Sequence, residues 1–317
     1  MSNETSHWDA MDGEILESEI APQIATMRND FLYFQKYPNA IRNKAYILGS
    51  FVVIFLIVAI AFATIIPQED LELLIQLSGG VIFFLLAGVF GLFGHGASVK
   101  KSMTNFLVAE KYGWFYDPRK SIQRLNEMQK KFPILRRGGG KGIGEQYWGK
   151  TLINGKKISF WMGLHHYETG SGKHRVSHEA TLMAFQMPRV VERPFYIREE
   201  MPGVIFAEKD IQLESIEFNK KFVVKHSDAE GSNATEIMQV LTPGAQQHFL
   251  ELAKKFEHFR VAFSGDAVLF SIEGDLLSPF YIDWFGKFEV DPQDEKLMHE
   301  NVNMLFGVAG EMVKFVD

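Results

Sequence analysis

The sequence contains no cysteine, and this absence excludes several kinds of chemistry at once. The chain can form no disulfide, thiolate nucleophile, iron–sulfur cluster or cysteine-ligated zinc site. The absence fits a reducing compartment without proving one, because many exported proteins also lack disulfides. Proline is scarce too, with 11 in 317 residues, while 13% of residues are aromatic. This composition indicates a chain that is mostly folded.

An excess of positive charge is also missing. Lys and Arg number 33 against 39 Asp and Glu, giving a formal net charge of -6. No global positive field therefore attracts nucleic acid, and we expect no nucleic-acid partner. The chain also lacks a nucleophile elbow, a kinase motif set and a Rossmann glycine fingerprint. We expect a protein without a cofactor and without catalysis of its own.

Charged residues are absent from two long stretches near the N-terminus. The run 45–66 reads AYILGSFVVIFLIVAIAFATII, and after a short connection at 67–72 a second uncharged run occupies 73–99. About 20 helical residues cross a hydrocarbon core of about 30 Å. The sequence therefore predicts a transmembrane hairpin over residues 45–99.

The positions of the cations predict its orientation, because Lys and Arg near a span resist translocation. The connection at 67–72 has neither residue. The flanking cations are Arg28, Lys36, Arg42, Lys44, Lys100, Lys101, Lys111, Arg119 and Lys120. We expect both termini to be cytoplasmic, and the protein to lie in the bacterial inner membrane with the lipid bilayer as a partner.

Small residues recur within the two runs. Gly88, Gly91 and Gly94 are three apart, and Ala45 and Gly49 are four apart. Such positions allow helices to approach closely. They favour packing of the hairpin on itself, with homo-oligomerisation as the alternative.

The segments on either side of the hairpin have different patterns. Residues 1–44 are expected to form a tail and an amphipathic helix, whose apolar stripe comprises Ile20, Ile24, Met27, Phe31 and Phe34. Residues 100–145 are expected to form a helical connector that ends in a Gly-rich joint at 136–145. The glycines and Lys141 suggest a phosphate cradle, but Lys141 is followed by Gly142 where a Walker loop needs Ser or Thr. We interpret this segment as a flexible joint.

A β-hairpin is predicted beyond the joint. Apolar residues alternate over 158–164, and a second strand pattern follows ETGSGK. A turn centred on Ser171 places Phe160 opposite Leu182 and Met162 opposite Ala180.

The same register places His166, Glu168, His174 and His178 on one face near the hairpin tip. Imidazoles and a carboxylate can bind zinc or another divalent metal, and histidines titrate near neutral pH. The spacing matches no named ligand motif, so a polar hairpin rim is the alternative interpretation.

The C-terminal part has the most regular pattern. A strand is expected at 222–225, and a helix from Ala234. A second helix is capped by Thr242 with Pro243 at its first position, and a hairpin joins 260–263 to 267–272. A final helix follows Pro292. We predict an α+β cytoplasmic domain over residues 146–317 with a mainly antiparallel sheet.

Three short patterns resemble a known bacterial family. They are Phe218-x-x-x-Phe222-x-Val224-x-x-x-Asp228, then Leu241-Thr242-Pro243, then the strands within 261–272. Together with two membrane helices ahead of a cytoplasmic domain, they resemble domain-of-unknown-function family 3137. The resemblance implies no catalytic residue or substrate.

Three functions remain open from the sequence. The first is a membrane-anchored interaction or scaffolding module that binds a protein partner or a second copy of itself. The second is a metal- or ligand-binding sensor, or a metal-dependent enzyme, that uses the histidine-rich hairpin. The third is a lipid- or ligand-binding module beneath the membrane.

Overall fold

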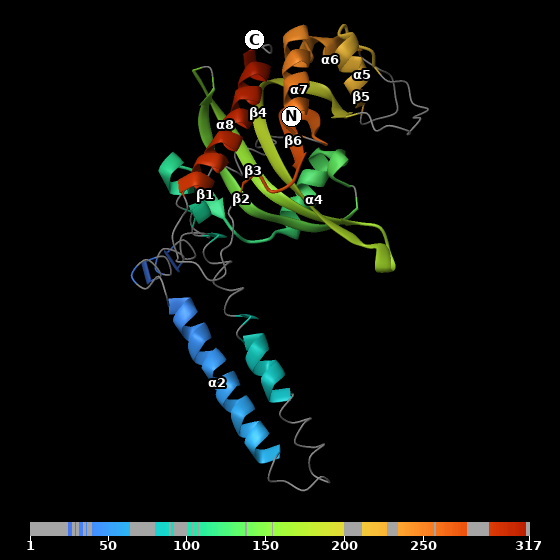
Figure 1. Cartoon of the computed structure of the whole chain (residues 1–317). Coiled ribbons are helices and arrows are strands. Elements are labelled where there is room, and N and C mark those ends of the chain that lie inside the picture. The colour runs from blue at the N-terminus through green and yellow to red at the C-terminus, as the bar shows by residue number, and fades with distance from the viewer. Residues whose placement is uncertain are drawn as a thin grey trace. The chain divides into compact units, whose positions relative to one another are not determined.

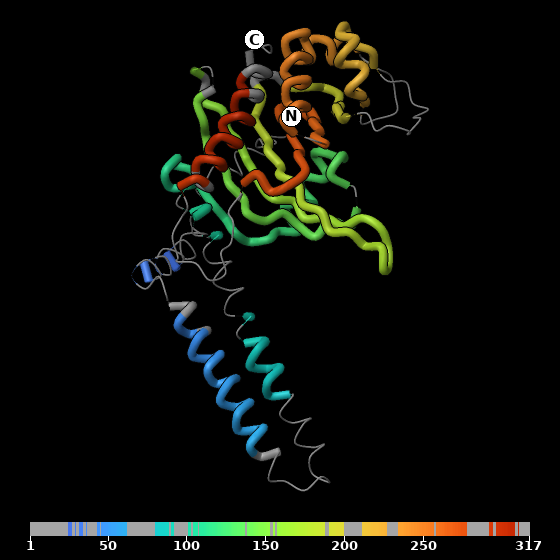
Figure 2. Tube along the Cα trace, viewed as in Figure 1, coloured from blue at the N-terminus to red at the C-terminus, as the bar shows by residue number. Residues whose placement is uncertain are grey.

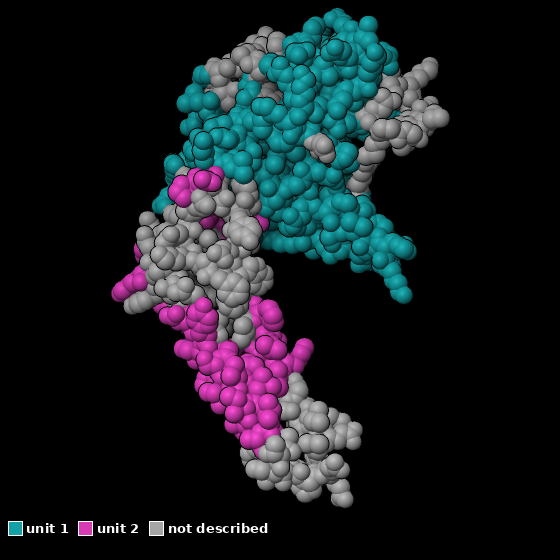
Figure 3. All heavy atoms as spheres, viewed as in Figure 1, with its two compact units in different colours: residues 1–20, 105–279, 295–317 teal, residues 21–104, 280–294 magenta. Residues whose placement is uncertain are grey.

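The computed structural model divides the chain into two compact units (Figure 3). Unit 1 comprises residues 1–20, 105–279 and 295–317, and unit 2 comprises residues 21–104 and 280–294. The structure describes residues 25, 26, 29, 32, 33, 36, 40–63, 80–88, 90–91, 101–102, 104–106, 108–136, 138–153, 155–199, 211–226, 234–256, 258–277 and 292–314.

Unit 2 contains the helix α2 (Ala40–Ala63) and a second helical segment at 80–88 and 90–91. A Cβ atom added at Gly88 would lie 3.1 Å from Leu48 Cδ2, so the absence of a side chain lets the two helices approach there. Gly49 and Gly91 have no such neighbour. Within the described part of the chain, no helix is long and apolar enough to be identified as a membrane span. All five residues of the predicted stripe, from Ile20 to Phe34, lie outside the described residues.

Unit 1 is built on an antiparallel sheet of six strands (Figure 1). The strands are β1 (Phe115–Asp117), β2 (Gly139–Ile153), β3 (Lys156–Thr169), β4 (Val176–Glu199), β5 (Phe222–His226) and β6 (Arg260–Glu273). They follow the order β1-β2-β3-β4-β5, and β6 pairs with the other edge of β4. With its helices, the unit confirms the predicted α+β class and antiparallel sheet.

The long strand β4 organises the sheet, as the tube in Figure 2 shows. Its first half pairs with β3, its last residues pair with β5, and β6 follows both halves. The prediction of a hairpin around Ser264–Asp266 is wrong, because β6 continues through Gly265 with a φ of 58°. An irregularity in β4 accompanies this point, with Val191 opposite Gly265. The extra residues of the irregularity lie in β4, on either side of Val191, and Gly265 continues β6 without reversing the chain.

The interpretation of 136–145 as a flexible joint is also wrong, because Gly139–Ile153 forms β2. Glycine has a packing role here. A Cβ at Gly140 would lie 2.6 Å from Leu125 Cδ2, and one at Gly142 would lie 3.0 Å from Lys120 Cγ. A side chain would not fit at Gly140 or Gly142, because the segment 120–125 crosses this strand closely.

Helices cover both faces of the sheet. On one face, Phe306 of α8 (Pro292–Lys314) packs edge-on against Phe160 at 5.1 Å and Phe185 at 5.8 Å. On the other face lie α4 (Ile122–Lys131) and the 3-10 turn η2 (Pro133–Arg136). Successive side chains of β3 alternate between these two sides. The final helix begins at Pro292 as predicted, and it buries Met298, Val302 and Leu305.

The family-like motif forms an aromatic core at the far end of the sheet. Phe218 of α5 (Ile216–Lys221), Phe222 of β5 and Phe249 of α7 (Pro243–Lys255) are all buried. Thr242 caps α7, with Oγ1 accepting a hydrogen bond from Ala245 N at 3.4 Å. The helix α6 (Ala234–Val240) precedes it. The predicted strand, both helices and the cap are confirmed, whereas Asp228 lies outside the described residues.

Candidate functional site

The structure places the four predicted hairpin residues in different surroundings. His166 Nδ1 lies 3.2 Å from Glu179 Oε1, and His178 Nε2 lies 2.7 Å from Thr169 Oγ1. Glu168 contacts Lys141 and lies 3.3 Å from Arg175 Nη1. These ion pairs, led by the Lys141 hydrogen bond, lower the pKa of the Glu168 carboxyl. His174 lies in the 3-10 turn η3 (Gly172–His174) at the hairpin tip.

The predicted register of this hairpin is wrong by three residues. Phe160 pairs with Phe185 and Met162 with Met183, because the connection between Thr169 and Val176 contains a 3-10 turn and is longer than a tight turn. An odd shift moves every side chain of one strand to the opposite face. His178 therefore lies beside Tyr167, with ring centroids 5.0 Å apart, and not beside His166 and Glu168.

The four residues consequently do not share one face. Across the residues that the structure describes, no group of three or more His, Cys, Asp or Glu side chains could hold a metal ion. A metal site formed by His166, Glu168, His174 and His178 stays a prediction, and this register does not favour it.

A neighbouring histidine, His165, occupies a more unusual position. It is 4% exposed and lies on the α4 side of the sheet, beside Gly140 and 5.2 Å from the Tyr167 ring. Tyr167 stacks between His165 and His178 and donates a hydrogen bond to Glu273 Oε1 at 2.6 Å. The His165 side chain therefore lies at one end of an aromatic stack. The hydrogen bond from Tyr167 to the Glu273 carboxylate holds this stack in place.

A small cavity adjoins this stack. It is lined by His165, Tyr167, Arg260, Ser271 and Glu273 together with η2, and it measures about 20 Å³. One water molecule needs about 10–15 Å³ by this measure. His165 Nε2 is buried without a hydrogen-bond partner among the described residues. The cavity can satisfy this nitrogen with one water, but it has no room for a substrate.

The pKa of His165 is lowered from 6.5 to about 4, chiefly because burial disfavours the charged ring, and secondly because His166 and Lys120 lie nearby. The imidazole is therefore neutral at physiological pH. Sequence reasoning selected neighbours that are less buried instead. The signal that could have identified His165 is its position directly after Gly163 and Leu164, at the end of a buried stretch.

This shift predicts acid-sensitive folding. The unfolded chain binds a proton at His165 below pH 6.5 and the folded chain does not, so stability falls as the pH drops from 6.5 towards 4. We expect His165 to contribute a loss of about 2 kcal/mol between pH 7 and pH 5. Chemical denaturation of the wild type and His165→Gln at both pH values measures it. An equal loss in the variant would contradict the prediction.

A larger groove lies at the start of α4. It measures about 490 Å³, and its lining includes Arg119, Lys120, Arg124, Gln146 and Trp148. Arg119 is held in place by Asp117, whose carboxylate accepts hydrogen bonds from Nε at 2.8 Å and Nη2 at 2.8 Å. The carboxylates Asp117 and Glu127 also line the groove, so its three cations face two anions. The groove is large enough for a small polar group.

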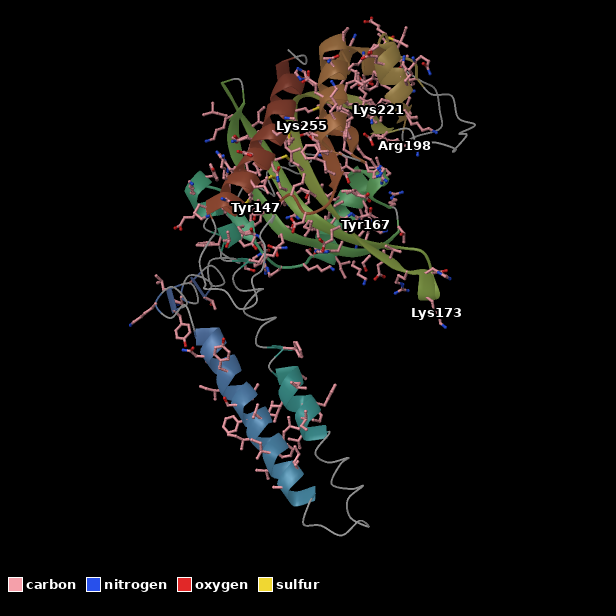
Figure 4. All side chains as sticks on the ribbon, viewed as in Figure 1. Tyr147, Tyr167, Lys173, Arg198, Lys221 and Lys255 are labelled. Carbon is pink, nitrogen blue, oxygen red and sulfur yellow. The ribbon has the colours of Figure 1, made fainter. Side chains whose placement is uncertain are left out.

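A buried carboxylate network joins the end of the connector to the sheet. Glu145 Oε2 accepts hydrogen bonds from Asn105 Nδ2 at 2.9 Å and from the Tyr116 hydroxyl. Glu145 has a φ of 48°, which a non-glycine residue adopts only when its surroundings hold it there. Tyr147, labelled in Figure 4, packs against the Tyr116 ring with centroids 4.9 Å apart. Burial is the first cause that raises the pKa of its phenol. The hydrogen bonds of Glu145 link Asn105 and Tyr116.

The architecture is thus that of an antiparallel α+β domain. Residues 195–314 match the family model described as protein of unknown function (DUF3137), which confirms the resemblance seen in the sequence. No curated protein matches the chain. The crystal structure of the mycobacterial trehalose monomycolate transport factor A, TtfA, is 12% identical, with a TM-score of 0.37 over 64% of this chain and 91% of that chain. This similarity is too low to support an argument.

Proposed function

We propose that the chain is an integral protein of the bacterial inner membrane, whose helical hairpin anchors a cytoplasmic interaction or scaffolding domain. The domain binds a protein partner or a second copy of the chain and performs no catalysis. The metal-dependent alternative receives no comparable support, because His178 lies apart from His166 and Glu168.

The exposed apolar surface of α2 carries this proposal. Nine of its large apolar side chains are 39–64% exposed, namely Tyr46, Ile47, Phe51, Val53, Ile54, Leu56, Ile57, Val58 and Ile60. In the second helical segment, Phe83 is 69% exposed and Phe84 is 75% exposed. A contiguous apolar surface of this kind requires a cover, and hydrocarbon is the cover that fits the uncharged part of α2, which follows Arg42 and Lys44 at its start. Both apolar runs also continue outside the described residues.

The charge distribution supports the proposed orientation. Lys and Arg lie before and after the two runs and are absent from the connection at 67–72. Short loops without cations are the ones that cross the membrane. The described domain and both termini are then cytoplasmic.

Membrane fractionation followed by mild-detergent purification tests the proposal. The full chain should stay in the membrane pellet after alkaline carbonate washing, and a stoichiometric partner or a defined homo-oligomer should purify with it. Deletion of residues 45–99 provides the control and should release the chain. Release of the wild type by carbonate, or consistently monomeric protein without a partner, would contradict the corresponding half of the proposal.

A further inference from the structure

We propose that a basic strip on unit 1 binds the anionic headgroups of the membrane in which the chain is anchored. The strip comprises Arg119, Lys120, Arg124, Lys141, Lys173 and Arg175. This inference rests on the proposed membrane anchor and adds a second, electrostatic contact with lipid. It names phospholipid phosphates as the ligand of a surface that otherwise has no assigned role.

The first end of the strip is the groove at the start of α4. Arg119, Lys120 and Arg124 line its volume of about 490 Å³. The ion pair with Asp117 fixes Arg119 while leaving its side chain 45% exposed. Ser121 caps the adjoining helix, with its hydroxyl accepting from Arg124 N at 3.0 Å. The ion pair holds the Arg119 guanidinium at the groove before any ligand arrives, which reduces the entropy lost on binding.

The strip continues across the glycine-rich strand β2. The Lys120 stem packs over Gly142, where an added Cβ would lie 3.0 Å from Lys120 Cγ. Lys141 precedes Gly142 and contacts Glu168, which also lies 3.3 Å from Arg175. Because Gly142 has no side chain, Lys120 lies over β2 next to Lys141. The Glu168 carboxylate in turn connects Lys141 with Arg175 of the β3–β4 hairpin.

The second end of the strip is the hairpin tip. Figure 4 places Lys173 at the end of this hairpin, which extends beyond the neighbouring strands. The residues 170–176 are all exposed and include no carboxylate. Val176 adds an apolar side chain that is 53% exposed. A basic tip with one exposed apolar residue suits the interface between headgroups and water.

The charge balance of the strip favours an anionic occupant. Asp117, Glu127 and Glu168 lie at salt-bridge distance from four of its cations, namely Arg119, Arg124, Lys141 and Arg175. The whole chain, by contrast, has a net charge of -6. Positive charge is thus concentrated here in a chain that is otherwise acidic. The anionic cytoplasmic leaflet attracts such clusters when a nearby anchor keeps them close to the surface.

The experiment uses the full chain in lipid nanodiscs. Because the chain has no cysteine, Ser171→Cys carries the only thiol, and a fluorophore attached there reports contact with quencher-labelled headgroups. Nanodiscs of phosphatidylcholine alone are compared with nanodiscs that also contain phosphatidylglycerol. We expect stronger quenching in the anionic discs, and its loss when salt rises from about 0.1 M to about 1 M and the Debye length falls from about 10 Å to about 3 Å.

Matched variants distinguish the loss of strip cations from the loss of the same number of positive charges elsewhere on the domain. Each cation removed should lower the ratio of docked to undocked hairpin about fivefold. Lys120→Gln, Lys141→Gln and Lys173→Gln together should therefore abolish the difference between the two lipids. The control replaces the exposed lysines Lys220, Lys254 and Lys255 by Gln and should leave it unchanged.

Two results would overturn the inference. One is equal quenching in neutral and anionic discs, and the other is a strip variant that behaves like the control. Capture of an acidic protein by the wild type without any lipid-dependent quenching would likewise assign the strip to a protein partner. A chain that fails to enter nanodiscs would instead contradict the membrane anchor, so the two failures are distinguishable.

Discussion

Residues 195–317 expressed alone will not fold, whereas residues 105–317 will. The family-matched segment 195–314 begins inside β4, so this truncation removes the half of β4 that pairs with β6 over 267–272. It also removes Phe160 and Phe185, which cover Phe306 of α8. Loss of this shared core leaves large apolar faces without a partner, and a domain of marginal stability does not survive that loss.

Circular dichroism during thermal unfolding measures this difference. The longer fragment should show a cooperative transition, and the shorter one should show none. The connector contacts give the reason for starting at residue 105, since Asn105 bonds to Glu145 and Tyr112 stacks on His299 at 5.0 Å. A cooperative transition in the 195–317 fragment would show that the family segment is autonomous.

Phe249→Ala should be the most destabilising single substitution in the family segment. Phe249 is 1% exposed and packs against Phe218 at 6.2 Å, Phe222 at 6.4 Å and Phe259 at 6.2 Å. Truncating a buried phenylalanine costs about 3–5 kcal/mol, because it loses apolar burial and leaves a cavity.

Chemical denaturation of the full chain provides the measurement for this substitution. Met238→Ala is the matched control, since Met238 lies on α6 and is 44% exposed. It should change the free energy of unfolding by less than about 0.5 kcal/mol. Similar losses in both variants would contradict the account of this aromatic core.

Local signals in the sequence predicted the C-terminal elements well. Thr242 and Pro243 specify the start of α7 through one hydrogen bond and one fixed dihedral angle, and neither depends on distant residues. The strand at 222–226 and the final helix from Pro292 were likewise marked by their own residues. Interactions between neighbouring residues are visible in a single sequence, so these predictions succeeded.

The hairpin register could not be obtained in the same way. Residues 161–165 of β3 and 180–185 of β4 are buried on both faces, so the apolar alternation over 158–164 does not distinguish one register from another. The predicted register therefore depended on the assumed position of the turn, and the sequence did not predict the 3-10 turn η3. The same register places His178 on the opposite face of the hairpin from His166 and Glu168.

The glycine-rich strand and His165 were missed because their roles depend on tertiary contacts. Gly140 and Gly142 resemble a flexible loop in sequence, but they are needed where Leu125 and Lys120 cross the strand. His165 acquires its lowered pKa from burial beneath α4 and η2. Neither packing partner is adjacent in the sequence, and no local pattern reports it.

Cysteine accessibility in intact cells tests the membrane anchor most directly. Each introduced cysteine is the only one in the chain. Gln68→Cys lies in the connection at 67–72, and Ser171→Cys lies on the β3–β4 hairpin. With the outer membrane opened, a membrane-impermeant maleimide should label Gln68→Cys at once and Ser171→Cys only after the inner membrane is lysed. Protection of both sites until lysis would contradict the two-span anchor, and labelling of Ser171→Cys before lysis would reverse its orientation.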